Sequence, residues 1–113
     1  MSTAVKVAGA LGLVGVLCGA FGAHGLEGRI SPHMLEIWNK AVLYNLIHAV
    51  ACLWASQRSK PLVIWLWTAG VVLFSGSLYL YAVLGIWWLT IATPIGGLFF
   101  LAGWLTVIIK PQG

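Results

Sequence analysis

A run of 49 residues without a charged side chain, residues 61–109, constrains this 113-residue chain more than any other feature. A transmembrane helix needs roughly 20 mostly apolar residues, and a charge at the bilayer centre costs on the order of 3 kcal/mol. The run is therefore long enough to cross a bilayer twice, which predicts a membrane protein. With 61% hydrophobic and 7% charged residues, the chain has room for one compact helical bundle and no separate soluble domain.

Four apolar segments are predicted to cross the membrane. Ser31 and Pro32 are a typical start for the second segment, because serine caps a helix N-terminus and proline costs nothing at the first helical position. Gly85 alone separates the last two segments, which indicates a tight antiparallel hairpin. The first segment also has the short positive start of a signal peptide, but we interpret it as a retained anchor. We expect an all-α four-transmembrane-helix bundle, one domain over residues 1–113, with spans at about 5–24, 33–56, 62–84 and 86–109.

The basic residues predict how the chain is oriented. With four spans, both termini lie on the same side of the membrane, and the positive-inside rule makes the side with more Lys and Arg cytoplasmic. We therefore expect cytoplasmic N- and C-termini. The net charge of +4 comes from isolated residues at segment ends, so it indicates how the chain is oriented in the lipid bilayer and excludes a nucleic-acid surface. The terminal side carries Lys6, Arg58, Lys60 and Lys110, and the other side carries Arg29 and Lys40.

A stripe of very small residues runs along the first segment at alternating steps of four and three. Such a stripe lets another helix approach closely, and close packing is a main source of helix association in lipid. Three partners are compatible with it: the second segment, the fourth segment, or another copy of the chain. The stripe consists of Ala8, Gly12, Gly15, Gly19 and Gly22.

Polar side chains follow the second segment from the outer surface to about mid-membrane. Glu36, Lys40, Tyr44 and His48 recur at intervals of four and share a slowly turning face. An ionisable residue deep in a span is by default a functional-site hypothesis, and His48 could take part in a proton relay. The residues favour the alternative, in which neutral His48 and Asn45 form hydrogen bonds to Ser or Thr on facing helices, worth roughly 0.6 kcal/mol each. Depth counting places the following residues in one candidate polar cluster in the outer half: His24, Tyr44, Asn45, His48, Ser75, Ser77, Tyr79 and Thr93.

Two further expectations concern the spans themselves. Thr93 and Pro94, followed by two glycines, predict a kink inside the fourth span, because proline removes one helical hydrogen bond. The tryptophans are predicted to lie near the two membrane interfaces, where amphipathic rings are favoured. The inner group is Trp54, Trp65, Trp67 and Trp104, and the outer group is Trp38, Trp87 and Trp88.

Metal, haem and hydrolytic sites have little support in the sequence. The histidines and the cysteines lie at different depths, so no set of three or four ligands converges. Glu36 lies at the mouth of its helix and no carboxylate is buried in a span, which also weakens proton-driven export. We therefore expect no metal site, no cofactor and no enzymatic activity. The residues concerned are His24 and His48, Cys18 and Cys52, and the carboxylates Glu27 and Glu36.

Four ordered motifs resemble those of a known family. They are residues 19–26 (GAFGAHGL), residues 38–49 with their Trp, Tyr and His, residues 74–79 (FSGSLY), and residues 93–97 (TPIGG) with Gly103–Trp104. Together they are similar to the YgdD-like small membrane proteins, the domain-of-unknown-function family number 423, which has mitochondrial relatives in eukaryotes. The resemblance implies a four-span protein of the bacterial inner membrane without an established biochemical role, and it carries over no catalytic residue. The motif positions are His24, Tyr44, His48, Ser75, Ser77, Tyr79, Thr93 and Pro94.

Three functions are compatible with these observations. The first is a non-enzymatic protein that acts by association, as a homo-oligomer or as an accessory subunit of another membrane protein, and the glycine stripe motivates it. The second is a small transporter or proton-linked carrier with its site around His48. The third is a lipid- or quinone-binding protein with its ligand between helices. A wet cavity around the polar cluster would favour transport, whereas complete pairing of its polar groups would favour a structural role.

Overall fold

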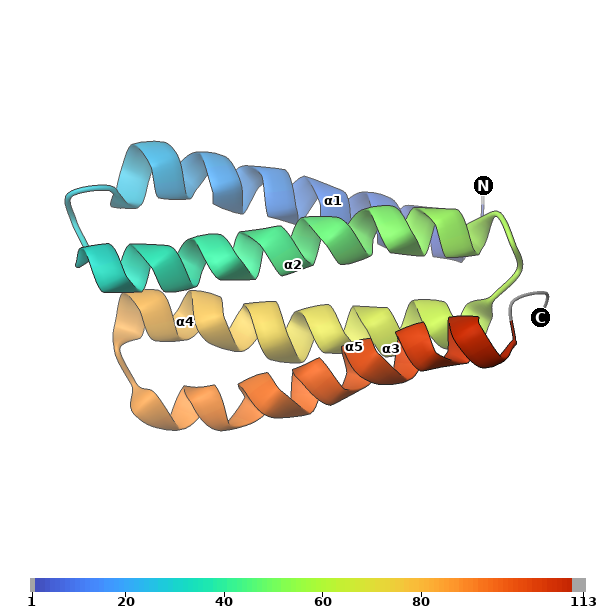
Figure 1. The fold of residues 1–113 in the computed structure, drawn as a ribbon. Coiled ribbons are helices and arrows are strands. Elements are labelled where there is room, and N and C mark those ends of the chain that lie inside the picture. The colour runs from blue at the N-terminus through green and yellow to red at the C-terminus, as the bar shows by residue number, and fades with distance from the viewer. Residues whose placement is uncertain (1, 111–113) are drawn as a thin grey trace.

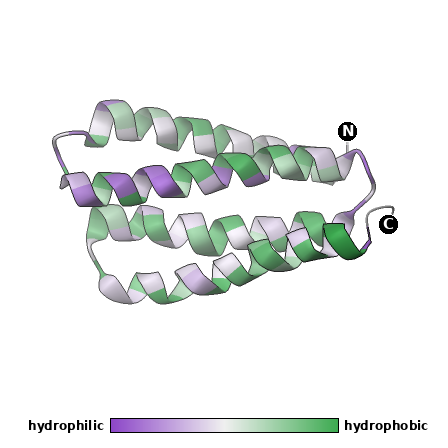
Figure 2. Cartoon of the chain, in the orientation of Figure 1, coloured by the Kyte–Doolittle hydropathy of each residue, from purple (hydrophilic) through white to green (hydrophobic). Residues whose placement is uncertain are grey.

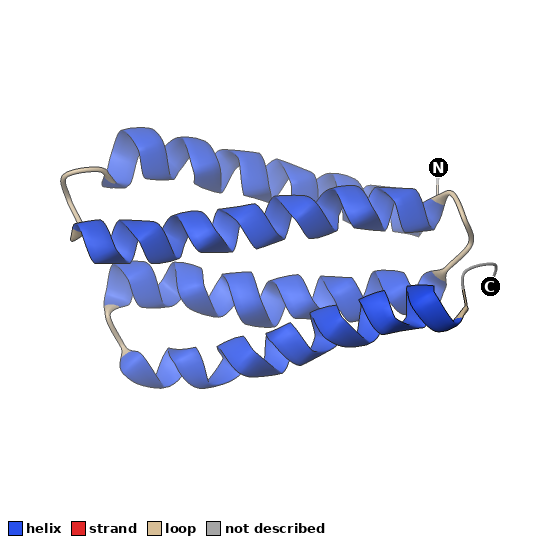
Figure 3. Ribbon diagram, viewed as in Figure 1, coloured by secondary structure: helices blue, strands red, loops and turns tan. Residues whose placement is uncertain are grey.

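The fold is described by a computed structural model that covers residues 2–110. Over this range the chain is helical and contains no strand (Figure 3). Four helical rods result, and the all-α prediction with four helices is confirmed. The rods are α1 (Thr3–Phe21) with the π-helical turn η1 (Gly22–Leu26); α2 (Pro32–Ser56); α3 (Pro61–Gly70) with the π-helical turn η2 (Val71–Ser75) and α4 (Gly76–Leu84); and the 3-10 turn η3 (Trp87–Ile91) with α5 (Ala92–Ile109).

Local chemistry explains where the rods begin and turn. The side chain of Ser31 accepts a hydrogen bond of 3.1 Å from the backbone N–H of Met34, and Pro32 occupies the first turn of α2. Gly85 ends α4 in the left-handed region, with φ of +71°, which glycine adopts without a steric penalty. The start of α2 and the turn of the last hairpin therefore lie where the sequence predicts them.

The rods lie antiparallel, and two of them occupy the centre of the molecule (Figure 1). α1 packs along α2, α2 packs along α3 and α4, and α5 packs along α3 and η2. Within residues 2–110, α1 and α5 do not come close to each other. The result is a flattened, open arrangement of 46 × 27 × 18 Å in which α1 and α5 are the outer helices.

The buried core follows this arrangement. One part lies at the end of the molecule that contains the start of α1 and the end of α5. The other part lies at the opposite end, which contains the α1–α2 and α4–η3 connections. Of the apolar 18-residue stretch within Pro61–Leu84, 44% is buried inside the molecule. The corresponding share is 11% in Thr3–Leu26 and 17% in Trp87–Ile109. The first part includes Cys52, Ile64, Trp67 and Phe100, and the second includes Leu26, Trp38 and Ala82.

Three helical segments are long and apolar enough to cross a membrane: Thr3–Leu26, Pro61–Leu84 and Trp87–Ile109. α2 is equally long at 25 residues but carries more polar side chains than the others, as its purple stretches in Figure 2 show. Two of these side chains, Asn45 and His48, are buried inside the molecule. The composition of α2 is therefore that of an inner helix. The start of α1, the end of α5 and the α2–α3 connection lie at one end of the molecule, called here the end that carries the termini (Figure 1).

Two details of the spans differ from expectation. Pro94 lies in the first turn of α5, where its missing N–H is not needed, and the irregular backbone is the 3-10 turn η3 before it. The predicted kink is thus replaced by a 3-10 start. Trp38 and Trp67 are buried in the core, with exposures of 6% and 0%, so they are packing residues and not interfacial anchors.

Candidate functional site

Asn45 joins three helices through its side-chain amide. Its Nδ2 donates a hydrogen bond of 2.8 Å to the backbone oxygen of Leu11 in α1. Its Oδ1 accepts a hydrogen bond of 2.9 Å from the hydroxyl of Tyr79 in α4. The residue is fully buried, so this pairing satisfies an amide that would otherwise be costly inside a membrane protein.

A second link between the same helices lies nearer the α1–α2 connection. The indole Nε1 of Trp38 donates a hydrogen bond of 2.8 Å to the backbone oxygen of Cys18. The Trp38 ring also packs against Tyr79, with ring centroids 4.6 Å apart. Tyr79 is therefore held by an amide on one side and an aromatic ring on the other.

His48 is buried between α2 and α5, and both of its ring nitrogens are engaged. Nδ1 lies 2.8 Å from the backbone oxygen of Tyr44, and Nε2 accepts a hydrogen bond of 3.0 Å from the indole N–H of Trp104. Because an indole N–H only donates, Nε2 must be unprotonated, so Nδ1 carries the proton and donates it to Tyr44. The ring also stacks on Phe100 at 3.8 Å between centroids, with 9° between the planes. The contacts thus select the neutral Nδ1–H tautomer.

The hydroxyl-bearing residues of the third rod form separate pairs. Ser75 is fully buried, and its hydroxyl donates a hydrogen bond of 2.7 Å to the backbone oxygen of Ala41. The hydroxyls of Ser77 and Thr93 lie 2.5 Å apart and link α4 to α5. Ser77 also donates to the backbone oxygen of Phe74 at 2.9 Å, so Thr93 is the donor in the pair.

The predicted cluster is therefore divided into separate pairs, and the expectation that His48 bonds to a serine or threonine is wrong. Asn45 and Tyr79 form one, His48 with the Tyr44 carbonyl another, Ser75 pairs with backbone, and Ser77 pairs with Thr93. His24 lies apart from all of them, exposed in η1. Among residues 2–110, no buried side-chain nitrogen or oxygen lacks a hydrogen-bond partner. In the same range, no three His, Cys, Asp or Glu side chains lie close enough together to hold a metal ion.

The glycine stripe of α1 faces α2 of the same chain. A Cβ atom placed on Gly15 would lie 2.5 Å from Cδ2 of Leu46, and one placed on Gly22 would lie 2.7 Å from the indole of Trp38. Gly12 and Gly19 also face α2, opposite Ala49 and Val42. The stripe is thus occupied within the molecule, and of the partners left open above it takes the second helix.

A second set of glycines allows close packing between α5 and the third rod, which consists of α3, η2 and α4. Gly96 lies against the backbone of Leu73 and Phe74, so a side chain there would collide with main-chain atoms. Gly103 lies against the indole of Trp67, and Gly70 against the ring of Phe100. Sequence reasoning missed this interface. The available signal was the spacing of seven residues between Gly96 and Gly103, which places both on one helix face.

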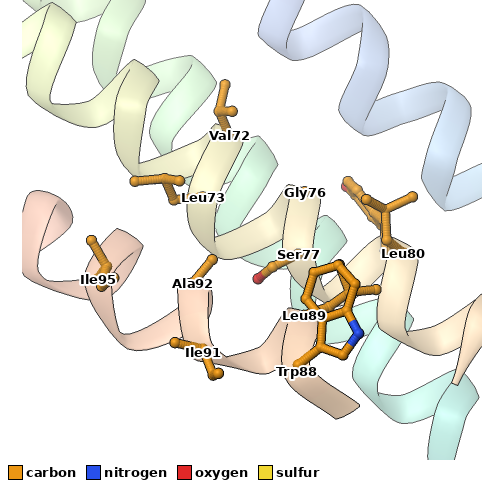
Figure 4. Close-up of a pocket in the computed structure, with 11 residues that line it drawn as sticks. Val72, Leu73, Gly76, Ser77, Leu80, Trp88, Leu89, Ile91, Ala92 and Ile95 are labelled. Atoms are coloured by element: carbon orange, nitrogen blue, oxygen red, sulfur yellow. The ribbon is translucent and has the colours of Figure 1, made fainter. Parts of the chain in front are cut away.

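An apolar groove of about 750 Å³ runs between α4 and the start of the last rod (Figure 4). Val72, Leu80, Trp88 and Ile95 contribute to its walls. The two side-chain hydroxyls at its lining, those of Ser77 and Tyr79, are engaged in the hydrogen bonds described above, and Trp88 contributes its indole ring. The groove therefore suits an apolar occupant.

A smaller groove of about 370 Å³ lies beside His48 and is lined mainly by aromatic and aliphatic side chains, Tyr44, Phe74, Leu98 and Phe100 among them. Because both nitrogens of His48 are already paired, the groove presents a ring face and no free polar atom of that residue.

Comparison with known proteins places the chain in a family. The family described as "Protein of unknown function (DUF423)" matches residues 18–97. The chain belongs to this family. A UPF0382 membrane protein of Staphylococcus haemolyticus is 44% identical over 111 residues, covering 87% of this chain and 91% of the relative. The UPF0382 membrane protein YwdK of Bacillus subtilis is 39% identical over 105 residues, covering 86% and 85%. No solved structure matches the chain.

The relatives are named membrane proteins, and together with the three apolar segments within residues 2–110 they identify a membrane protein. The matched range contains Asn45, Ser75, Tyr79 and Thr93 but ends before Trp104. The resemblance stated from the motifs is thereby confirmed. The arrangement of its polar groups is that of interhelical hydrogen bonds in a packed membrane domain.

Proposed function

We propose that this DUF423 protein is a non-enzymatic, four-span protein of the bacterial inner membrane that acts by associating with a second copy of itself. The observation that carries the proposal is the complete pairing of buried polar side chains within residues 2–110. In that range every buried side-chain nitrogen or oxygen has at least one hydrogen-bond partner, which favours a structural role over a proton relay. Functional contacts are then made through the outer surface.

The exposed side of α2 supports its role as the fourth span. Its exposed side chains between Leu43 and Trp54 are Leu43, Tyr44, Ile47, Val50, Leu53 and Trp54, all of them apolar or aromatic. A helix of 25 residues is about 37 Å long, and the hydrocarbon core is about 30 Å thick. α2 is therefore long enough to span, with its polar first turns in the headgroup region. The four basic residues at the end that carries the termini favour a cytoplasmic position for that end.

The same exposed side of α2 is self-complementary. Glu36, Lys40, Leu43, Ile47, Val50 and Trp54 follow one another at alternating steps of four and three, and all are exposed. In a parallel two-fold pair of α2 helices, Glu36 of each copy lies near Lys40 of the other copy, which is one helical turn deeper in the membrane. The apolar residues form the contact between the two helices below these charges. The glycine stripe that first motivated association is not available for it, because α2 of the same chain covers it.

A charge-swap series tests this association. Lys40→Glu should reduce crosslinking between copies in native membranes, because it places like charges opposite each other. The double variant Glu36→Lys with Lys40→Glu should restore crosslinking, since it reverses the pair and keeps its complementarity. Equal crosslinking in all three forms, or a chain that stays monomeric in membranes, would remove the proposal.

The apolar groove favours a second candidate, binding of a lipid or quinone between α4 and α5. Gly76 lines the groove, and a Cβ atom placed on it meets nothing within 4 Å, so the side chain of Gly76→Leu starts in open space and should fill the groove. Native mass spectrometry should then show a retained ligand mass on the wild type that Gly76→Leu loses. Gly9→Leu is the matched control, because Gly9 also has open space around it and lies far from the groove in sequence.

A proton-linked carrier with its site at His48 has less support, because the neutral ring is paired at both nitrogens. Flux in proteoliposomes with wild type beside His48→Ala tests it directly. Flux that the substitution abolishes would favour the carrier over the association proposal.

A further inference from the structure

The end of the molecule that carries the termini contains a buried lysine. Lys60, the residue before α3, has a side chain that is only 4% exposed. Its Nζ donates a hydrogen bond of 2.8 Å to the backbone oxygen of Lys110 at the end of α5. A pocket of about 200 Å³ opens beside it, between the first turn of α3 and the last turn of α5, and Lys60, Thr106 and Lys110 are among its lining residues.

This end has basic side chains and no acidic ones. The chain has only two carboxylate side chains, Glu27 and Glu36, and both belong to the opposite end. The ammonium of Lys60 has three N–H groups, of which the Lys110 carbonyl accepts one. Among residues 2–110, no carboxylate side chain lies at this end to balance the ammonium, and because a buried cation without an opposite charge is costly, an anion would stabilise it.

The neighbouring surface is apolar and lies where lipid tails would pass. Leu62 lines the pocket and is 58% exposed, and Ile108 and Ile109 of α5 are 74% and 65% exposed. Arg58 lies over the ring of Trp54, 5.4 Å from its centroid, in the same polar connection as Lys60. A cationic pocket thus sits directly above exposed aliphatic side chains.

We propose that the pocket between Lys60 and Lys110 binds the phosphate of an anionic phospholipid, whose acyl chains lie along Leu62 and the end of α5. The lysines recognise the negative charge, and the aliphatic surface distinguishes a lipid from free phosphate. The site is independent of the proposed association through α2 and requires only that the chain lies in a bilayer.

Native mass spectrometry of the full chain, released from micelles containing phosphatidylglycerol or phosphatidylcholine, tests this site. The wild type should retain phosphatidylglycerol in preference to phosphatidylcholine. Because each basic residue near a membrane surface contributes about 1 kcal/mol, Lys110→Gln should lower retention about fivefold. Lys60→Gln should lower it at least as much.

The control is Arg29→Gln, which removes one positive charge from the opposite end and should keep the wild-type preference. If Lys60→Gln does not fold, Lys110→Gln decides alone, because Lys110 is exposed and contributes its backbone carbonyl in either form. Retention that is equal in wild type and Lys110→Gln would overturn the site. Loss of bound lipid on adding an equal amount of inorganic phosphate would mean a simple anion site without lipid recognition, and would also overturn the proposal.

Discussion

At the scale of single residues, Asn45 shows how polar groups are used in this molecule. Its amide donates to α1 and accepts from α4, so one side chain fixes the relative positions of three helices. Gly15 makes this possible, because a Cβ atom there would lie only 3.1 Å from the amide nitrogen. The sequence predicted that Asn45 would belong to a polar cluster in the outer half of the membrane. Its partners depend on how each helix is rotated about its axis, which hydrophobicity alone does not determine.

The pair of Asn45 and Tyr79 should contribute measurably to stability. Asn45→Leu keeps the side-chain shape but removes both hydrogen bonds, and should lower the free energy of unfolding by about 1–2 kcal/mol. In a double-mutant cycle with Tyr79→Phe, measured by denaturant unfolding in micelles, the coupling should be about 0.6 kcal/mol. A coupling of zero would show that the hydroxyl and the amide do not interact.

His48 should hold one tautomer. Because Trp104 donates to Nε2, ¹⁵N NMR of the ring should show a protonated Nδ1 and an unprotonated Nε2. Trp104→Phe removes the donor and should change the Nε2 signal while leaving the Nδ1 signal close to that of the wild type. The exposed His33 serves as the internal reference, and a protonated Nε2 in the wild type would contradict the assignment.

At the scale of elements, the helices follow from patterns that are local in sequence. Ser31 with Pro32 marks the start of α2, and Gly85 marks the turn of the last hairpin. The π-helical turns η1 and η2 and the contact of Gly96 with η2 were not predictable in this way. They depend on which faces of two distant segments meet, and the sequence presents Gly96 and Gly97 as equivalent neighbours.

These two adjacent glycines should respond differently to the same substitution. Gly96→Ala places a methyl group against the backbone of Phe74 and should destabilise the protein by about 1–3 kcal/mol, the usual cost of overpacking. Gly97→Ala meets nothing within 4 Å and should be neutral or stabilising by up to about 1 kcal/mol through helix propensity. Unfolding in micelles measures both, and equal effects would mean that α5 is rotated differently.

At the scale of the whole molecule, composition predicted an all-α membrane protein, but it could not predict which helices are central. α2 and the rod from Pro61 to Leu84 form the core, and the polar content of α2 is a consequence of that position. An inner helix can carry Asn45 and His48 because its neighbours supply their partners. The separate pairs replace the predicted single cluster because the side chains that share a depth range point toward different neighbours.

The four-span topology can be checked by cysteine labelling from the two sides of the membrane. In a background with Cys18 and Cys52 replaced, Ser59→Cys in the α2–α3 connection should react with an impermeant reagent only from the cytoplasmic side. Gly28→Cys in the α1–α2 connection should react only from the other side. Labelling of both positions from one side would show that α2 does not cross.

The pairing of distant helices also has a consequence for synthesis. Asn45 receives its second hydrogen bond from Tyr79, 34 residues later, and His48 receives its own from Trp104, 56 residues later. At about 5–20 residues per second, the ribosome needs roughly 2–7 s to reach the first partner and about 3–11 s to reach the second. During that interval α2 holds an unpaired amide oxygen and an unpaired imidazole nitrogen at the membrane, so its release into lipid should wait for the helices that follow.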